Sequence, residues 1–187
     1  MPRIHLGVYE TSGNSTKKAV TYALEAGYRA IDSAEWYENE AEVGSAIKTF
    51  LSSNPKKGDL KREDIWFTTK LRTNNSYDAT RKEVKESLRK SGLGYLDLYL
   101  LHSPLGGKRR RLECWRAVED AIEDGEVRCG GVSNFGVGHV CFRFFSSPWP
   151  HIQISPFLPY PRFGIHRHFW WLLCSVGLWM LTMWDIC

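Results

Sequence analysis

The sequence lacks several features that would assign it to other classes of protein. Its five cysteines form no C-x-x-C pair and are odd in number, which argues against a disulfide framework and against a zinc site. The opening stretch MPRIHLGVYE contains no apolar run of the kind found in a signal peptide. The net charge of +4 is far below the concentration of Lys and Arg typical of nucleic-acid-binding proteins. These absences predict a cytoplasmic protein with reduced cysteines and no nucleic-acid partner.

The composition changes abruptly near Phe135. Beyond this residue the only acidic side chain is Asp185, lysine is absent, and five of the eight tryptophans occur. The apolar run Phe169 to Trp184 has 16 residues, fewer than the roughly 20 that a membrane-spanning helix needs. We therefore expect no membrane association, with a weak membrane or partner anchor as the alternative. An aberrantly encoded C-terminus explains this segment better.

Short β-branched runs alternate with helical patterns up to about residue 135. The predicted strands cover residues 3–9, 28–34, 65–71, 95–102 and 127–134. The predicted helices cover residues 16–27, with Ser15 as N-cap, and then 40–51, 78–90 and 111–123. Strands that are apolar on both faces, each followed by a helix, indicate a parallel sheet covered by helices.

Two architectures use such a sheet, the doubly wound open sheet and the closed barrel. The turn after the first strand reads GVYETSGN, which lacks the G-x-G-x-x-G pattern of a dinucleotide-binding open sheet, and the chain has no P-loop. The α/β fold expected is therefore a (β/α)8 barrel of the TIM-barrel type. Such barrels have about 250 residues, so we expect an incomplete one with five to six strand–helix units.

Polar residues interrupt the apolar strands at one end of each strand. The steps between them are 38, 32 and 31 residues, close to one strand–helix unit each. Singly, each is explained as a helix cap or a solvated charge, but together they are expected to meet at the carboxyl rim of the barrel, where barrel enzymes have their active sites. They are Asp32, Lys70, His102 and the pair Ser133 and Asn134, with Tyr37 on the loop after Asp32.

These side chains suit the protonation of a developing oxyanion. A lysine ammonium beside a tyrosine hydroxyl favours the phenolate, so the tyrosine gives up its proton more readily. An aspartate holds the lysine, and a histidine orients the reacting oxygen by a hydrogen bond. This chemistry needs no metal and fits carbonyl reduction, provided that a cofactor delivers hydride. Paired carboxylates for glycoside cleavage and a nucleophile elbow are absent.

The motifs GYRAIDSAEWYENEAEVGSAI, KREDIWFTTKL, YLDLYLLHSP and VRCGGVSNF occur in this order, and with them the sequence resembles the aldo-keto reductase superfamily, its fungal members in particular. The resemblance implies a (β/α)8 barrel, NADPH as cofactor and a small aldehyde or ketone as substrate. It also implies a catalytic tetrad of Asp32, Tyr37, Lys70 and His102.

The same resemblance implies further contacts with the cofactor. Ser133 and Asn134 would bind the nicotinamide carboxamide, and Tyr9 would border nicotinamide and substrate, with Trp36 lining the substrate pocket or packing. His151 stands where the family has a glutamine that contacts the carboxamide.

The resemblance covers residues 1–135 and fades over 136–158, which contain a possible sixth strand, whereas residues 159–187 match nothing. The family's Lys/Ser/Arg cluster for the adenosine 2′-phosphate has no counterpart here. A second hypothesis therefore stays open, a catalytically inactive aldo-keto reductase-like chain without this cofactor clamp. The oligomeric state also stays open.

Overall fold

The computed structural model describes residues 1–53, 60–136 and 139. The predicted sixth strand, His151 and the apolar run Phe169–Trp184 lie outside the described residues. Within the described part of the chain, no helix has both the length and the apolar character needed to cross a membrane. The elements are β1 (Leu6–Gly7), α1 (Gly13–Glu25), β2 (Ala30–Asp32), η1 (Glu35–Tyr37), α2 (Glu40–Ser53), η2 (Arg62–Asp64), β3 (Trp66–Leu71), α3 (Tyr77–Ser91), β4 (Leu96–Leu101), α4 (Gly107–Glu123) and β5 (Val127–Val132).

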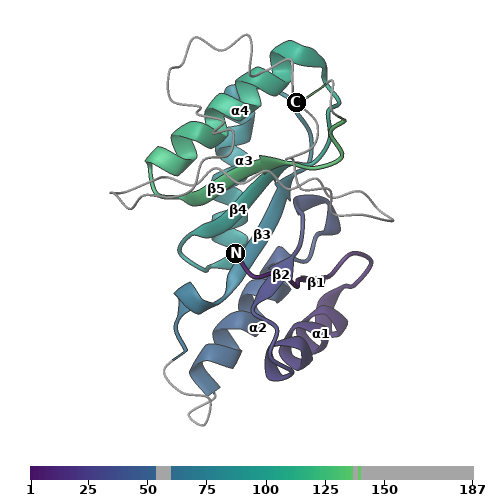
Figure 1. Ribbon diagram of the computed structural model, residues 1–187, viewed down its shortest axis with the longest axis vertical. Coiled ribbons are helices and arrows are strands. Elements are labelled where there is room, and N and C mark those ends of the chain that lie inside the picture. The colour runs from purple at the N-terminus through teal and green to yellow at the C-terminus, as the bar shows by residue number, and fades with distance from the viewer. Residues whose placement is uncertain (54–59, 137–138, 140–187) are drawn as a thin grey trace, which may run out of the picture.

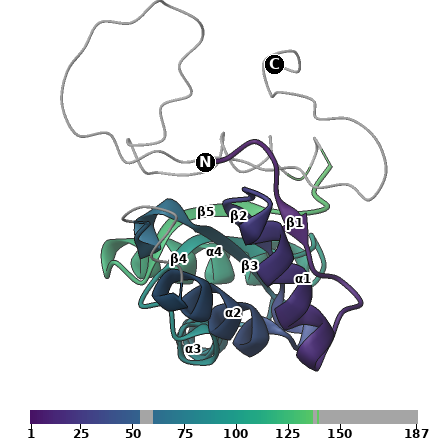
Figure 2. The same ribbon diagram turned by 90° about the horizontal axis from the view of Figure 1, so that it is seen from below.

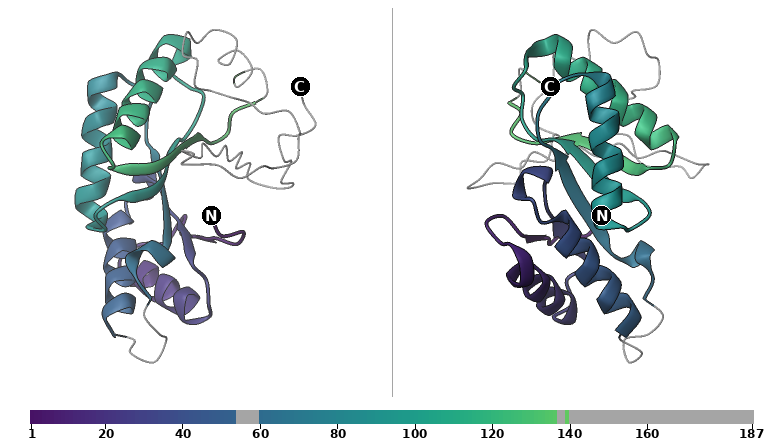
Figure 3. Two further views of the ribbon diagram at one scale, coloured as in Figure 1. Left: turned by 60° about the vertical axis from the view of Figure 1, so that its left-hand side comes forward. Right: turned by 180° about the vertical axis from the view of Figure 1, so that it is seen from behind.

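The five strands form one parallel sheet in the order β1-β2-β3-β4-β5, so each strand pairs with its successor in the chain (Figure 1). The helices α1 to α4 all cover the same face of this sheet, as Figures 2 and 3 show. A doubly wound open sheet carries helices on both faces, whereas a barrel keeps every helix outside. The described residues therefore form part of a (β/α)8 barrel, as the sequence predicts.

The helix and strand boundaries differ from the predicted ones by three or more residues at three places, and elsewhere by at most two. The first strand is only Leu6–Gly7, far shorter than residues 3–9. Helix α1 begins three residues earlier than expected, with Ser12 as N-cap, and Ser15 lies in its first turn, where its hydroxyl oxygen accepts the Ser12 N–H at 3.2 Å. Helix α4 begins at Gly107 and not near residue 111, since Gly106 adopts the left-handed conformation (φ 90°) at its N-cap.

Two apolar clusters lie on opposite faces of the sheet. The larger packs β1 to β5 against the helices and includes Phe67, Tyr99 and Leu101, all fully buried. The smaller contains Ala30, Trp66, Leu98, Leu100 and Cys129 on the face without helices. Every residue of β3 and β4 is buried, which confirms the prediction of strands that are apolar on both faces. In a barrel this second face is the one that points inward.

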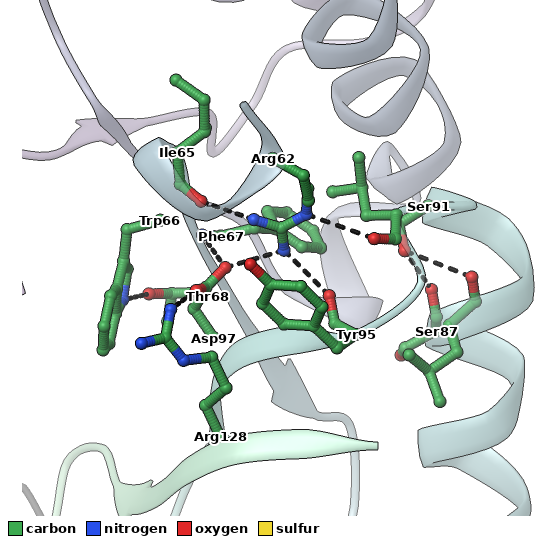
Figure 4. Close-up of polar contacts among 12 residues, drawn as sticks. Arg62, Ile65, Trp66, Phe67, Thr68, Ser87, Ser91, Tyr95, Asp97 and Arg128 are labelled. Carbon is green, nitrogen blue, oxygen red and sulfur yellow. Dashed lines mark hydrogen bonds and ion pairs between the residues drawn. The ribbon is translucent and has the colours of Figure 1, made fainter. Parts of the chain in front are cut away.

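A buried carboxylate organises the amino ends of the last three strands (Figure 4). Asp97 on β4 is fully buried and accepts hydrogen bonds from Arg62 Nη2 at 2.7 Å, the backbone N–H of Phe67 at 3.0 Å and Arg128 Nη1 at 2.9 Å. The Arg62 guanidinium also stacks on the Tyr95 ring, 4.1 Å from its centroid. Asp97 therefore joins η2, β3 and β5, at the end of the sheet opposite to the polar residues predicted to react.

We predict that Asp97→Ala lowers the free energy of unfolding by about 3 kcal/mol. The substitution removes the carboxylate that pairs with the Arg62 guanidinium, whose other acceptors are backbone oxygens, and it leaves the buried N–H of Phe67 without its acceptor. The measurement is urea unfolding followed by tryptophan fluorescence. Asp124→Ala is the control, since it removes a carboxylate that is 58% exposed and only 2.6 Å from Arg81, and an exposed pair contributes less than about 1 kcal/mol. Equal losses in the two variants would contradict a structural role for Asp97.

Candidate active site

Three of the predicted residues come together because parallel strands end at the same edge of the sheet. Asp32 is the last residue of β2, Lys70 is the last but one of β3, and His102 directly follows β4. The register pairs Asp32 with Thr68 and Lys70 with Leu100, so the three side chains lie on neighbouring strands, each two residues further along than the one before it. The polar residues that follow one another at about one strand–helix unit along the chain therefore form a cluster in space.

The Lys70 ammonium is buried and donates three hydrogen bonds. Its Nζ lies 2.5 Å from Asp32 Oδ1, 2.8 Å from the backbone oxygen of Ser33 and 3.3 Å from the hydroxyl oxygen of Tyr37. An ammonium group has three protons, so all of them are used. Since Lys70 donates to the oxygen of Tyr37, the phenolic proton stays available for a different acceptor.

Tyr37 lies in the short 3-10 helix η1, where the sequence predicted a loop. Its backbone N–H donates to Ala34 O at 3.0 Å, and Glu38 ends the turn in the left-handed conformation (φ 55°). The Glu35 carboxylate ties this turn to the end of β3 by accepting the N–H of Arg72 at 2.9 Å. The turn therefore holds the phenol directly above Lys70, with Nζ 4.8 Å from the ring centroid.

The imidazole of His102 faces the Tyr37 ring across the site. The ring centroids are 5.8 Å apart with an interplanar angle of 74°. Burial, and to a lesser extent the positive charge of Lys70, lowers the pKa of His102 from 6.5 to about 4. Its buried Nδ1 has no hydrogen-bond partner among the described residues. At neutral pH the ring is therefore uncharged, with one N–H to donate and one nitrogen to accept.

Two exposed aromatic side chains border these groups. Tyr9, in the turn after β1, has its ring centroid 5.0 Å from that of Tyr37 and is 66% exposed. Trp36 packs edge-on against His102, with 5.9 Å between centroids, and is 56% exposed. The two rings therefore provide exposed aromatic surface next to Tyr37 and His102.

Ser133 and Asn134 directly follow β5 and are joined to the same site. The Asn134 amide donates to the backbone oxygen of His102 at 2.9 Å and to Ser133 Oγ at 3.0 Å. Asn134 adopts the left-handed conformation (φ 62°), which asparagine tolerates better than most residues. In residues 1–53, 60–136 and 139, no group of three or more His, Cys, Asp or Glu side chains is placed to hold a metal ion.

Sequence reasoning missed two residues that support this arrangement. The first is Ser33, which contributes its backbone oxygen. Every residue type has a backbone carbonyl group, so the sequence does not indicate this role. Asn39 is fully buried and binds the Ser33 hydroxyl through its amide oxygen at 2.7 Å. A polar residue just before a predicted helix at residue 40 normally indicates an N-cap, so its contact with a strand end was not foreseeable from the pattern.

Comparison with known proteins gives one consistent family. Residues 4–142 match the model of the aldo/keto reductase family. An uncharacterized oxidoreductase of Schizosaccharomyces pombe is 44% identical over 139 residues, which are 74% of this chain and 48% of that protein. The crystal structure of an aldo/keto reductase from Brucella melitensis has a TM-score of 0.71 at 39% identity, over 79% of this chain and 55% of that one.

A Bombyx mori aldo-keto reductase solved in complex with NADP has a TM-score of 0.67 at 33% identity, over 80% of this chain and 52% of that one. The chain thus spans about half the length of the relatives it matches.

The low pKa of His102 predicts a loss of stability in acid. The unfolded chain takes up the proton near pH 6.5 and the folded chain only near pH 4. The contribution of this group is therefore complete above about pH 6.5 and is lost as the pH falls towards 4. We expect the free energy of unfolding in urea to decline across this range, and to decline less in His102→Gln. An NMR titration of His102 with its midpoint near the ordinary histidine value would contradict the prediction.

Proposed function

The chain belongs to the aldo/keto reductase family, and from that premise we propose that it reduces the carbonyl group of a small aldehyde or ketone to the alcohol, with NADPH as hydride donor. The observation that carries this proposal is the hydrogen bond from the buried Lys70 ammonium to the hydroxyl oxygen of Tyr37. It leaves the phenolic proton directed at a ligand and stabilises the phenolate that remains once the proton has moved.

Tyr37 is the general acid of the proposed reaction. As the carbonyl oxygen gains negative charge, the Tyr37 hydroxyl gives it a proton, and the O–H bond of the phenol breaks as that of the alcohol forms. The phenolate left behind lies 3.3 Å from the Lys70 ammonium. Proton transfer by a positioned side chain contributes about 100-fold or more to a rate.

Asp32 is the ionic partner of the buried Lys70 ammonium. An unpaired ammonium is costly to bury, and the carboxylate at 2.5 Å offsets that cost. Asp32 therefore acts through Lys70, whereas Lys70 acts directly on Tyr37.

His102 orients the reacting oxygen. Because its pKa is about 4, the ring is neutral at pH 7 and does not repel the Lys70 ammonium. A neutral imidazole N–H opposite Tyr37 can donate a hydrogen bond to the carbonyl oxygen. The oxygen then has two donors, one from each side of the site.

The described residues fit the nicotinamide group of NADPH. A carboxamide has an N–H₂ donor and a C=O acceptor, and the Asn134 amide oxygen and the Ser133 hydroxyl proton complement these two groups. The Asn134 side-chain nitrogen is already held by His102 O, so its oxygen is fixed in direction. When bound, NADPH supplies the hydride that the carbonyl carbon accepts. The NADP complex of the Bombyx mori relative supports this choice of cofactor.

The exposed rings of Tyr9 and Trp36 favour a substrate with an apolar group next to its carbonyl, because they offer apolar surface beside Tyr37 and His102.

Cys114 is a free, buried cysteine, which fits a reducing compartment such as the cytoplasm.

We predict that Tyr37→Phe lowers the turnover of a small aromatic aldehyde by about 100-fold or more, because it removes the acidic proton and keeps the ring. Lys70→Met is expected to lower turnover to a similar degree. The assay follows the oxidation of NADPH by absorbance. Tyr22→Phe is the matched control, since this tyrosine is 64% exposed on α1. Full turnover by Tyr37→Phe would remove Tyr37 as the acid.

Urea unfolding with and without excess NADPH separates binding from chemistry. A ligand of the folded state shifts the transition to higher urea, and we expect this shift in both the wild type and Tyr37→Phe. A wild type that neither shifts with NADPH nor reduces aldehydes would support the alternative function, a chain that keeps the family's site without catalysis.

A further inference from the structure

Asn39 lies behind the site and contacts none of the groups proposed to react. It directly precedes α2 and is fully buried. Its amide nitrogen donates to the backbone oxygens of Val8 at 2.9 Å and Thr11 at 3.0 Å, and its amide oxygen accepts the Ser33 hydroxyl at 2.7 Å. One side chain therefore joins the turn after β1, the end of β2 and the start of α2.

Both segments that Asn39 holds continue directly to the site. The backbone oxygen of Ser33 accepts the Lys70 ammonium at 2.8 Å. The turn between Val8 and Thr11 carries Tyr9, whose ring packs on Tyr37. A shift of Ser33 would move an acceptor of the Lys70 ammonium, and a shift of the turn between Val8 and Thr11 would move the Tyr9 ring that packs on Tyr37.

The contacts are unusual for a residue at the start of a helix. Such an asparagine commonly accepts an N–H of its own first turn, but here the amide oxygen receives the Ser33 hydroxyl. The Ser33 backbone is itself held from the other side, because its N–H donates to Thr68 O at 2.9 Å. The residue that presents its carbonyl to Lys70, Ser33, is thus held through both its main chain and its side chain.

We propose that Asn39 is a positioning residue for the general acid Tyr37. Through the Ser33 hydroxyl it holds the Ser33 carbonyl, which accepts one of the three Lys70 protons. Through the backbone oxygens of Val8 and Thr11 it holds the turn that places Tyr9 against Tyr37. This inference rests on the proposed function, since it assigns Asn39 a task in the same proton transfer. Every contact in it lies within the described residues, so it can be tested without the cofactor.

The test compares three variants of the 187-residue chain. Ser33→Ala removes the hydroxyl that binds Asn39 and keeps the main chain. Asn39→Ala removes both sets of bonds. Ser91→Ala is the matched control, since Ser91 is equally buried but its hydroxyl binds only Ser87 and Leu88 within α3.

The first readout is the exchange of the Lys70 ammonium protons with water, measured by NMR and assigned by the loss of the signal in Lys70→Met. We expect slow exchange in the wild type and in Ser91→Ala. We expect exchange to be faster by about tenfold in Ser33→Ala, as for the loss of one hydrogen bond, and faster still in Asn39→Ala. A purely structural role would lower stability and leave this exchange unchanged.

The second readout is turnover of the aldehyde with NADPH. In Ser33→Ala we expect kcat to fall by about tenfold with KM nearly unchanged, because the substrate's own contacts are intact. Unchanged Lys70 exchange in Ser33→Ala overturns the proposal, whether or not Asn39→Ala folds. If the wild type shows no turnover but Lys70 exchange is still faster in Ser33→Ala than in the wild type, the proposed function is contradicted. The positioning role of Asn39 is then retained.

Discussion

The burial of the Lys70 ammonium is the constraint on which the rest of the site depends. A charge out of contact with water needs a partner for every proton, and Lys70 finds its three in Asp32, the Ser33 carbonyl and the Tyr37 hydroxyl. These acceptors come from the end of β2, the residue after it and η1, while the ammonium comes from β3. The parallel register of β2 and β3 is therefore a condition for the charge to be buried at all.

Two clusters of charged and polar side chains lie at opposite ends of the sheet, one at the amino ends of its strands and one at the carboxyl ends. At the amino ends, fully buried Asp97 accepts from Arg62, Arg128 and a backbone N–H, so its charge is compensated within the fold. At the carboxyl ends, the buried Nδ1 of His102 has no partner among the described residues, and the Tyr37 hydroxyl keeps a proton to donate. The first cluster stabilises the fold, whereas the second has groups left to bind a ligand and react.

The sequence predicted the strand ends better than the helix starts. Asp32, Lys70 and His102 interrupt apolar strands at steps of about one strand–helix unit, and a spacing of that length does not depend on errors of one or two residues in the boundaries. The start of α1 was misplaced because Ser12 and Ser15 are both good caps, and only the contacts of the folded turn select Ser12. The helix α4 begins earlier than predicted because Gly106 adopts a left-handed conformation at its N-cap, and a glycine's residue type does not specify its conformation.

The sequence by itself determined the order of strands and helices, the parallel sheet and the residue types gathered at one end of it, because periodicity and strand direction are properties of the chain. The tertiary structure decided which atoms meet. It put the Tyr37 hydroxyl oxygen beside Lys70, lowered the pKa of His102 by burial, and gave Asn39 its contacts with the turn after β1 and with Ser33. These depend on distances between segments that lie far apart in the sequence, and on the exclusion of water from around them.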